Sequence, residues 1–269
     1  MGRGALDMGA LSFQTMPPGG QPARFVDLRR FDQLDSTNRL ALELASAGAS
    51  EGVVVVADHQ TAGRGRRGRT WSAPPRSSLL ASVLLRPPVA ADSAPVVGMA
   101  VALATADACA EVAGVAPALK WPNDLVAPDG SAKLAGVLGE AVITGERLAA
   151  LVVGVGLNVT PASATVDGAV ALEDLAGRAV DGEGLLAGWL VHLQRRYAEV
   201  VSPGGTAAVL DAYRQACTTL GRRVRVELAS GSFVGRAVDL SDSGHLVVAT
   251  STGRRQVAAA NVVHLRPAS

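Results

Sequence analysis

An arginine- and glycine-rich run carries the strongest chemical signal in this sequence of 269 residues. Residues 63–69 read Gly-Arg-Gly-Arg-Arg-Gly-Arg, so four guanidinium groups alternate with three glycines. Glycine lets the backbone approach a ligand and present consecutive N–H groups, while arginine binds phosphate or carboxylate oxygens through paired hydrogen bonds. The run therefore indicates an anion-binding loop. Taken alone, it is also compatible with a solvated basic loop or an Arg/Gly nucleic-acid patch.

The glycine spacing of this run also matches the dinucleotide-binding fingerprint, which requires a helix directly after the glycines. The residues that follow, Thr-Trp-Ser-Ala-Pro-Pro at 70–75, cannot open a helix because of the prolines. A nicotinamide-binding loop is therefore excluded. The sequence has neither a Walker phosphate loop nor the downstream signatures of a protein kinase.

Both lysines of the sequence lie in a second polar stretch, whereas the arginines number 23. This stretch reads Lys-Trp-Pro-Asn-Asp at 120–124, and Lys-Leu-Ala-Gly follows at 133–136. An ammonium group is a compact, mobile point charge, unlike the planar guanidinium fork. Two lysines with an Asn/Asp pair suit the oxygens of a triphosphate and a magnesium ion. An ordinary Pro/Asn/Asp turn is the competing interpretation.

Two further stretches offer neutral polar groups or room for a ligand. Residues 35–38 read Asp-Ser-Thr-Asn, whose hydroxyls and amide either bind a polar ligand or cap a helix. Residues 154–158 read Gly-Val-Gly-Leu-Asn, and glycines inside a strand indicate either close approach of another group or a bulge. We assign no chemistry to the four histidines, which have no metal-ligand spacing.

Composition excludes several classes of protein. With 25 basic and 24 acidic side chains, the net charge of +1 gives no overall attraction to nucleic acid or anionic lipid. Two cysteines, Cys109 and Cys217, are too few for a disulfide scaffold. The most apolar long stretch, residues 96–116, contains Asp107 and Glu111, so we predict a soluble helix rather than a membrane span. A reduced, cytoplasmic protein without a membrane partner is expected.

The hydrophobic pattern predicts an α+β fold. Strands are expected at 25–34, 53–57, 78–85, 118–121, 134–142 and 148–159, the last two forming a hairpin. Helices are expected after residue 36, at 95–113, and around Leu185–Tyr197 and Val209–Cys217. From residue 218, β-like runs at 222–228, 233–240, 245–250 and 255–265 alternate with turn residues and predict a small antiparallel β-barrel. We therefore divide the chain into a flexible tail (1–22), a catalytic domain (23–217) and a β-barrel domain (218–269).

Taken together in this order and spacing, these motifs resemble the biotin protein ligase family over residues 30–266. The resemblance implies a mixed sheet with packed helices, as in class II aminoacyl-tRNA synthetases. It also implies two reaction steps: the biotin carboxylate attacks the α-phosphate of ATP to give biotinyl-AMP, and a carrier-protein lysine then attacks that mixed anhydride. A carboxylate that approaches a triphosphate needs surrounding cations and Mg²⁺, which agrees with the residue types found.

The resemblance further implies roles for single residues. Arg64 and Lys133 are the expected catalytic residues, Lys133 acting at the biotin carboxylate or the acyl-phosphate oxygens. Biotin is expected to contact Ser36, Thr37, Asn38, Gln60, Arg64, Gly65, Arg66 and Lys133. ATP is expected to contact Arg69, Trp71, Lys120, Asn123, Asp124 and Asn158, with the Trp71 ring covering the adenine. No metal ligand is assigned.

The expected partner is the biotin carboxyl carrier domain of acetyl-CoA or acyl-CoA carboxylase. About thirty residues precede the first motif, so we expect the monofunctional type, with no N-terminal DNA-binding domain and no DNA partner. The enzymatic alternative, a lipoate ligase or octanoyltransferase, lacks the Arg/Gly run. The non-enzymatic alternative, a nucleic-acid-binding module, disagrees with an aromatic content of 3% and the balanced charge. The sequence does not decide between a monomer and a homodimer.

One requirement tests this interpretation as a whole. If the arginines and lysines act on one anionic junction, Lys120 and Lys133 must face the Arg/Gly loop across a shared cavity.

Overall fold

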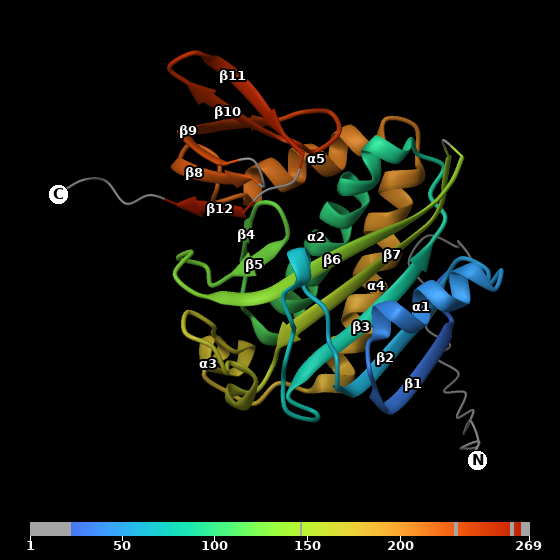
Figure 1. Cartoon of the computed structure of the whole chain (residues 1–269). Helices are drawn as coiled ribbons and strands as arrows, with labels where there is room; N and C mark the ends of the chain where they lie inside the picture. The colour runs from blue at the N-terminus through green and yellow to red at the C-terminus, as the bar shows by residue number, and fades with distance from the viewer. Residues whose placement is uncertain (1–22, 146, 229–230, 259–260, 265–269) are drawn as a thin grey trace.

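Two β-sheets organise the chain, which we describe from a computed structural model over residues 23–145, 147–228, 231–258 and 261–264 (Figure 1). The first sheet has seven strands in the order β1-β2-β3-β7-β6-β5-β4. Its strands β1 and β2 are parallel and its other pairs are antiparallel, so the sheet is mixed, as predicted. The strands are β1 (Asp27–Leu34), β2 (Val53–Gln60), β3 (Ser78–Leu85), β4 (Ala118–Lys120), β5 (Asp124–Val126), β6 (Lys133–Thr144) and β7 (Arg147–Asn158).

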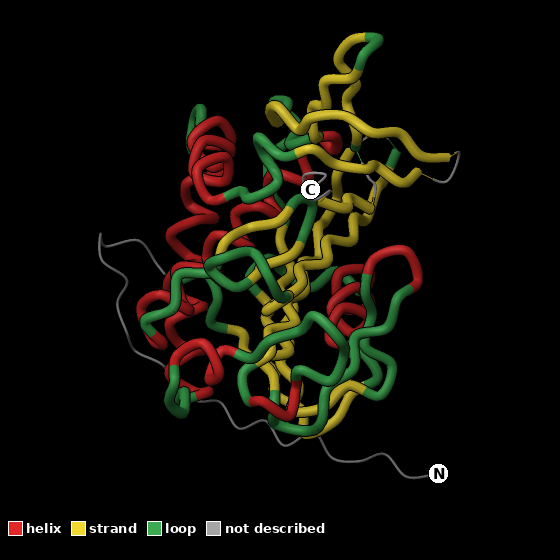
Figure 2. The backbone as a smooth tube through the Cα atoms, turned by 90° about the vertical axis from the view of Figure 1, so that its left-hand side faces the viewer, coloured by secondary structure: helices red, strands yellow, loops and turns green. Residues whose placement is uncertain are grey.

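Helices cover both faces of this sheet (Figure 2). In β2, Val53 and Val55 belong to the apolar cluster around α1, while Val54 and Val56 belong to the larger core with α2 and α4. This alternation is the period of two that a strand imposes on its side chains. The helices are α1 (Thr37–Ser46), α2 (Ala94–Ala113), α3 (Leu172–Ala176), α4 (Gly182–Val201) and α5 (Gly205–Ala216).

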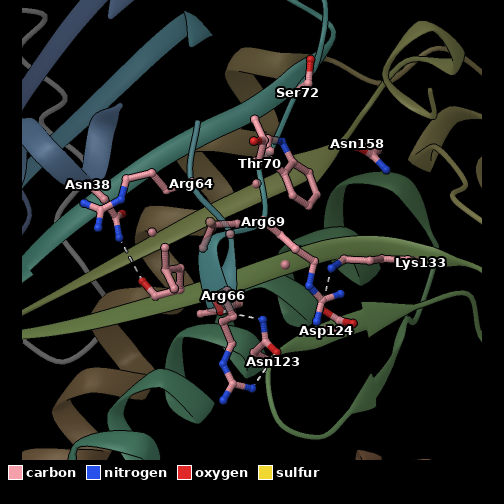
Figure 3. A pocket seen from close by; sticks show the side chains of 18 of the residues that line it. Asn38, Arg64, Arg66, Arg69, Thr70, Ser72, Asn123, Asp124, Lys133 and Asn158 are labelled. Atoms are coloured by element: carbon pink, nitrogen blue, oxygen red, sulfur yellow. Dashed lines mark hydrogen bonds and ion pairs between the residues drawn. The ribbon is translucent and has the colours of Figure 1, made fainter. Parts of the chain in front are cut away.

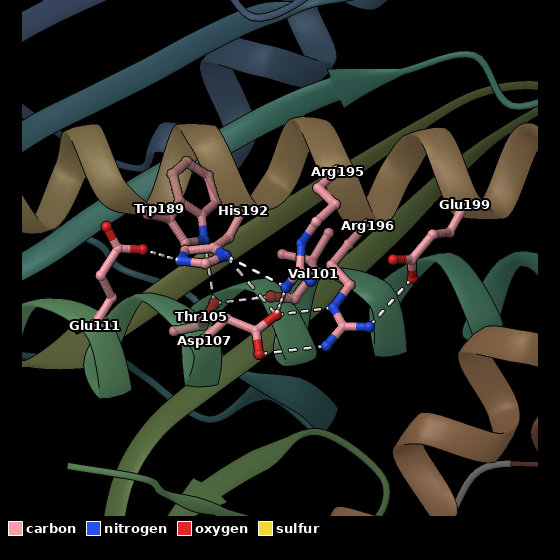
Figure 4. A network of polar contacts seen from close by, with 9 residues as sticks. All are labelled: Val101, Thr105, Asp107, Glu111, Trp189, His192, Arg195, Arg196 and Glu199. Atoms are coloured by element: carbon pink, nitrogen blue, oxygen red, sulfur yellow. Dashed lines mark hydrogen bonds and ion pairs between the residues drawn. The ribbon is translucent and has the colours of Figure 1, made fainter. Parts of the chain in front are cut away.

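The long helices α2 and α4 are joined by a polar network as well as by apolar packing (Figure 4). Asp107 of α2 accepts hydrogen bonds of 2.8 Å from both Arg195 and Arg196 of α4. Deeper in the same interface, the indole of Trp189 donates to Thr105 Oγ1 at 3.1 Å. This network rigidifies the helix layer behind the sheet.

Helix α2 is the apolar segment for which we predicted a soluble helix. With the turn before it, it forms Ala91–Ala113, the one candidate among the described residues that is long and apolar enough to cross a membrane. In this fold, 67% of its most apolar window is buried inside the protein. It is therefore accounted for as a core helix of the α2–α4 layer.

The second sheet is antiparallel, with the strand order β11-β10-β9-β8-β12. Val224 and Val226 are buried while Arg223 and Arg225 are exposed, so one face of this sheet joins the core and the other faces solvent. The predicted small antiparallel β domain is thus confirmed, but the described strands form a sheet with two edges, β11 and β12, and not the predicted closed barrel. Its strands are β8 (Arg223–Leu228), β9 (Gly231–Leu240), β10 (Leu246–Thr250), β11 (Gly253–Val257) and β12 (Asn261–His264).

Most predicted elements are confirmed, and a few differ in their bounds. Strand β3 has the predicted bounds, and β6 and β7 form the predicted hairpin. The single run predicted at 255–265 is wrong, because β11 and β12 are separate strands at opposite edges of the second sheet. The sequence also gave no signal for α3, a helix of five residues, which is too short to show helical periodicity.

A buried tryptophan connects the two sheets. Trp121 is 2% exposed, its backbone N–H donates to Thr219 Oγ1 at 3.0 Å, and its indole N–H donates to the Gly244 carbonyl at 3.0 Å. Thr219 Oγ1 also lies 3.1 Å from His264 Nε2. One continuous apolar core includes residues from both sheets. The domain boundary near residue 218 stays a prediction.

We predict that His264 makes stability fall in mild acid. Burial, together with repulsion from Lys120 and Arg222, lowers the pKa of His264 from its usual 6.5 to about 4. Between these two values the unfolded chain binds a proton that the folded chain does not, so this contribution to stability is complete above pH 6.5 and is lost as the pH falls toward 4. Urea unfolding at pH 7 and pH 5 measures the loss, which His264→Gln should reduce. An equal loss in that variant would contradict the prediction.

Candidate active site

A cavity of about 430 Å³ lies over the face of the first sheet, beside the N-terminus of α1 (Figure 3). This volume is in the range of small-molecule sites. Its walls come from α1, the end of β2 and the loop after it, the turn between β4 and β5, strands β6 and β7, residues 163–169 after β7, and Val262 of β12. All the residues predicted to bind biotin or ATP line it: Ser36, Thr37, Asn38, Gln60, Arg64, Gly65, Arg66, Arg69, Trp71, Lys120, Asn123, Asp124, Lys133 and Asn158.

The Arg/Gly loop is a closed hairpin. The Trp71 N–H donates to the Gly63 carbonyl at 2.9 Å, and the Gly65 N–H donates to the Arg69 carbonyl at 2.7 Å. A side chain at position 63 would overlap the Trp71 carbonyl, so glycine is required for this closure. At the tip, Arg67 has φ +57° and donates from Nη1 to the Glu227 carbonyl of β8 at 3.1 Å. The loop therefore bridges the two sheets above the cavity.

Both lysines line the same cavity as the arginines of this loop, so the shared cavity that the sequence interpretation required is present. Lys120 and Lys133 line the same wall region as Asp124, and Lys133 Nζ lies 2.7 Å from Asp124 Oδ1. Among the described lining residues, six side chains are basic and Asp124 is the one carboxylate. This imbalance produces a positive potential that favours anionic ligands.

Arg66 is held by an amide rather than by a carboxylate. Its Nη1 donates to Asn123 Oδ1 at 3.2 Å, and Asn123 Nδ2 donates to the Val137 carbonyl at 3.1 Å. Burial lowers the pKa of Arg66, because desolvation disfavours the charged form. Within the described chain Arg66 makes no ion pair, so its charge is available to an anion in the cavity.

Trp71 lies flat against two glycines of the sheet. A Cβ at Gly156 would come within 2.5 Å of the indole, and one at Gly136 within 3.3 Å. The pairing of β6 with β7 is regular at these positions, so the strand glycines reflect close approach and not a bulge. Lys133 Nζ lies 5.6 Å from the Trp71 ring centroid. The Trp71 indole N–H is buried and has no hydrogen-bond partner among the described groups.

The opposite end of the cavity, around Asn38, is polar, and it is neutral overall because Arg64 beside Asn38 is paired with Glu140 (Figure 3). Ser36 caps α1 by accepting from the Arg39 N–H at 3.4 Å, and the Thr37 N–H donates to Gln60 Oε1 at 2.8 Å. Asn38 Nδ2 donates to the Leu138 carbonyl at 3.2 Å. The 35–38 motif thus caps a helix and lines the cavity at once.

Two polar residues behind this end were missed by the sequence interpretation. Glu140 of β6 pairs with Arg64 Nη2 at 2.8 Å and accepts from Asn38 Nδ2 at 2.8 Å. Ser82 of β3 is fully buried, and its hydroxyl contacts Thr37 and Asn38. The signal available was a polar residue inside an otherwise apolar strand, which a period-of-two pattern does not distinguish from an ordinary outward-facing position.

The described residues contain no group of three or more His, Cys, Asp or Glu side chains able to hold a metal ion. Asp124 with its neighbouring amides is therefore the donor set available near the basic side chains. Such a set fits Mg²⁺, which is usually bound by one or two carboxylates together with substrate phosphates.

These features define the class of biotin/lipoate A/B protein ligases, whose family model matches residues 30–158. A second model, the biotin protein ligase C-terminal domain, matches residues 219–265. The chain therefore belongs to the biotin protein ligase family, which attaches biotin to protein through biotinyl-AMP. The match of the C-terminal domain favours this enzyme over the lipoate-specific alternative.

Individual relatives agree with this assignment. A biotin–[acetyl-CoA-carboxylase] ligase of Mycobacterium tuberculosis is 40% identical over 241 residues, 87% of this chain and 87% of the relative. The bifunctional ligase/repressor BirA of Bacillus subtilis is 31% identical over 236 residues, 86% of this chain and 72% of the relative. The solved biotin protein ligase of Aquifex aeolicus in complex with biotin and ATP has a TM-score of 0.74 at 25% identity, covering 90% of this chain and 100% of that chain.

We predict that Gly156→Ala displaces the Trp71 ring, because the added methyl group would overlap the indole. The chain has three tryptophans, so ¹⁹F NMR of 5-fluorotryptophan-labelled protein should give three main resonances. The resonance absent from Trp71→Phe should shift in Gly156→Ala. Gly139→Ala is the matched control, since a Cβ there meets Leu151 only at 3.9 Å. An unshifted resonance in Gly156→Ala would refute this placement of the ring.

Proposed function

We propose that the neutral end of the cavity binds the biotin ring and the cationic end binds ATP, so that both half-reactions occur between them. The observation that carries this proposal is the convergence of Lys120, Lys133 and the loop arginines on one cavity with a neutral polar end. A bicyclic urea with a carboxylate tail matches that polarity, because its ring is uncharged and its tail is anionic.

At the neutral end, Ser36, Thr37, Asn38 and Gln60 are the proposed partners of the ureido group. A ureido ring has two N–H donors and one carbonyl acceptor, and a buried ring would lose stability if these were left unpaired. Hydroxyl and amide side chains supply the complementary groups without adding charge. Arg64, Gly65 and Arg66 continue this wall toward the valerate tail.

At the junction, the proposed role of Lys133 is to neutralise the carboxylate and the phosphate oxygens while the new C–O–P linkage forms. Its ion pair with Asp124 keeps the ammonium at the cavity, and four rotatable bonds let it move to an arriving anion. Arg64 and Arg66 add charge on the other side of the junction. Cations placed where charge develops lower the barrier to phosphoryl chemistry.

For the nucleotide we propose contacts with Arg69, Trp71, Lys120, Asn123, Asp124 and Asn158. The Trp71 ring offers an aromatic surface for adenine, and Lys120 and Arg69 offer cations for the phosphates. Asp124 would hold Mg²⁺ together with triphosphate oxygens. When bound, the ion supplies positive charge that offsets the departing pyrophosphate.

For the second step we propose transfer to a lysine of a biotin carboxyl carrier domain of acetyl-CoA or acyl-CoA carboxylase. Support comes from the relatives in Mycobacterium tuberculosis and Paracoccus denitrificans, both named as biotin–[acetyl-CoA-carboxylase] ligases. The Arg/Gly loop shields the mixed anhydride from water until the acceptor arrives. Such an acceptor places the reaction in the cytoplasm.

The direct test incubates the purified chain with ATP, Mg²⁺ and either biotin or lipoate. Pyrophosphate release and labelling of a recombinant carrier-domain lysine are followed by mass spectrometry. Biotin should support both readouts, and omission of Mg²⁺ should abolish them. Turnover of lipoate in place of biotin would overturn the proposal.

Lys133→Ala should block the first half-reaction, because the junction loses its mobile cation. We expect kcat/KM for biotin-dependent pyrophosphate release to fall by on the order of a hundredfold or more. Chemically prepared biotinyl-AMP should partly restore carrier labelling. Arg195→Ala is the matched control, since it removes a cation from the α2–α4 network instead. Normal adenylate synthesis by Lys133→Ala would remove this lysine from the mechanism.

A further inference from the structure

A fully buried hydroxyl lies behind the neutral end of the cavity. Ser82 is 0% exposed and does not line the cavity, yet its Oγ lies 2.7 Å from Thr37 Oγ1 and 2.6 Å from Asn38 Oδ1. Thr37 and Asn38 both line the cavity, and both are at least 96% buried, with exposures of 3% and 4%. The direction of the hydrogen bonds at Ser82 therefore determines whether the Thr37 hydroxyl at the cavity wall can donate a hydrogen bond to a ligand or can only accept one.

The orientation of the Asn38 amide is fixed by its neighbours. Its Nδ2 donates one proton to the Leu138 carbonyl at 3.2 Å and the other to Glu140 Oε2 at 2.8 Å. A flipped amide would set its oxygen against two acceptors. Oδ1 therefore faces Ser82, and because a carbonyl oxygen only accepts, the short contact between them uses the single Ser82 proton.

The position of the Thr37 hydroxyl proton then follows from the number of donors and acceptors around it. With its own proton directed to Asn38, Ser82 Oγ is an acceptor, so the 2.7 Å contact with Thr37 takes the Thr37 hydroxyl proton. Gln60 Oε1 is a second acceptor for the Thr37 hydroxyl, but it lies farther, at 3.1 Å, and it also accepts the Thr37 N–H at 2.8 Å. In either arrangement the Thr37 hydroxyl proton is used inside the protein. Thr37 Oγ1 is left with lone pairs and no proton for a ligand.

We propose that Ser82 is a positioning residue that makes the Thr37 hydroxyl an obligate hydrogen-bond acceptor toward the cavity. The Thr37 hydroxyl then favours a ligand whose ring places an N–H donor next to it, and it disfavours a ligand whose ring places an oxygen there. The inference rests on the proposed binding of biotin at this end. It extends that proposal, because Ser82 sets the specificity without touching the ligand.

Gly154 of β7 gives this network its space. A Cβ at that position would overlap Asn38 Oδ1 and would come within 3.1 Å of Ser82 Oγ. The glycine therefore permits the short Ser82–Asn38 hydrogen bond, across a separation of 44 residues in the chain. Glu140 ends the relay and joins it to Arg64, so the neutral end is tied to the Arg/Gly loop.

The test compares biotin with its two carbamate isomers, in each of which one ureido N–H is replaced by a ring oxygen. Adenylate formation gives kcat/KM for each compound. The wild-type chain should reject one isomer by on the order of a hundredfold relative to biotin, because two acceptors would then face each other. In Ser82→Ala the Thr37 hydroxyl loses its nearer acceptor and can donate to the ring oxygen, in competition only with the longer contact to Gln60 Oε1. This ratio should therefore fall about tenfold, mainly through KM for the analogue.

Ser78→Ala is the matched control, because it removes a hydroxyl from the same strand that has no partner among the described groups. Its ratio should equal that of the wild type, and KM for ATP should stay within about twofold in both variants. General damage would lower kcat/KM for all three compounds together and leave the ratio unchanged. If Ser82→Ala does not fold, Ser82→Cys carries the same comparison with a weak donor of similar shape.

An unchanged ratio for both isomers in a folded Ser82 variant would overturn the inference, as would a wild-type chain that accepts both isomers as well as biotin. Failure of the proposed function is distinguishable, because the wild-type chain would then not activate biotin in the same assay.

Discussion

Mutual repulsion among the basic side chains around one cavity is the constraint on which the rest of this structure depends. Six cations and one carboxylate line the site among the described residues. Arg64 and Lys133 are paired with carboxylates, Glu140 and Asp124, and the remaining cations leave a net positive charge. Such a cluster is stable only if each basic side chain is held in place by its own polar contacts. The structure does this with short-range polar contacts: Arg64 with Glu140, Arg66 with Asn123, Arg67 with a backbone carbonyl of β8, and Lys133 with Asp124.

The same constraint explains why glycine is concentrated around the site. Bulky groups must lie close to the sheet so that the cavity between them and the loop can admit a ligand. Gly156 accommodates the Trp71 ring, and Gly154 accommodates the Asn38 amide. In the loop, Gly63 allows the hairpin to close on the Trp71 carbonyl. Close approach of functional groups is therefore achieved by omission of side chains from the sheet surface.

The fold class and many of the polar residues that line the cavity could be predicted from the sequence because their signals are local. The Arg/Gly run and the Lys-Trp-Pro-Asn-Asp stretch each concentrate their chemistry in a few consecutive residues, and their order along the chain supported the family resemblance. Ser82 and Glu140 could not be found this way. Each is a single polar residue in an apolar strand. Their shared partner Asn38 is 44 residues from Ser82 and 102 residues from Glu140 along the chain. Contacts of this kind depend on which strands are neighbours in the sheet, and they produce no periodic pattern in the sequence. For the same reason the sequence did not show that β11 and β12 are two strands, because their separation depends on the strand order of the second sheet.

The buried position of Trp121 has a consequence for how the chain can vary. The same five-residue motif supplies one cation, one amide and one carboxylate to the cavity, and its indole donates to the Gly244 carbonyl in the turn between β9 and β10. The small sheet thereby supports the end of the cavity proposed to bind the nucleotide, although only one residue of it, Val262, lines the cavity among those described. A replacement of this sheet by one from a distant homologue would have to preserve a carbonyl acceptor and an indole-sized recess. Exchange of modules between such enzymes is therefore constrained at the Gly244 turn, which does not itself line the cavity.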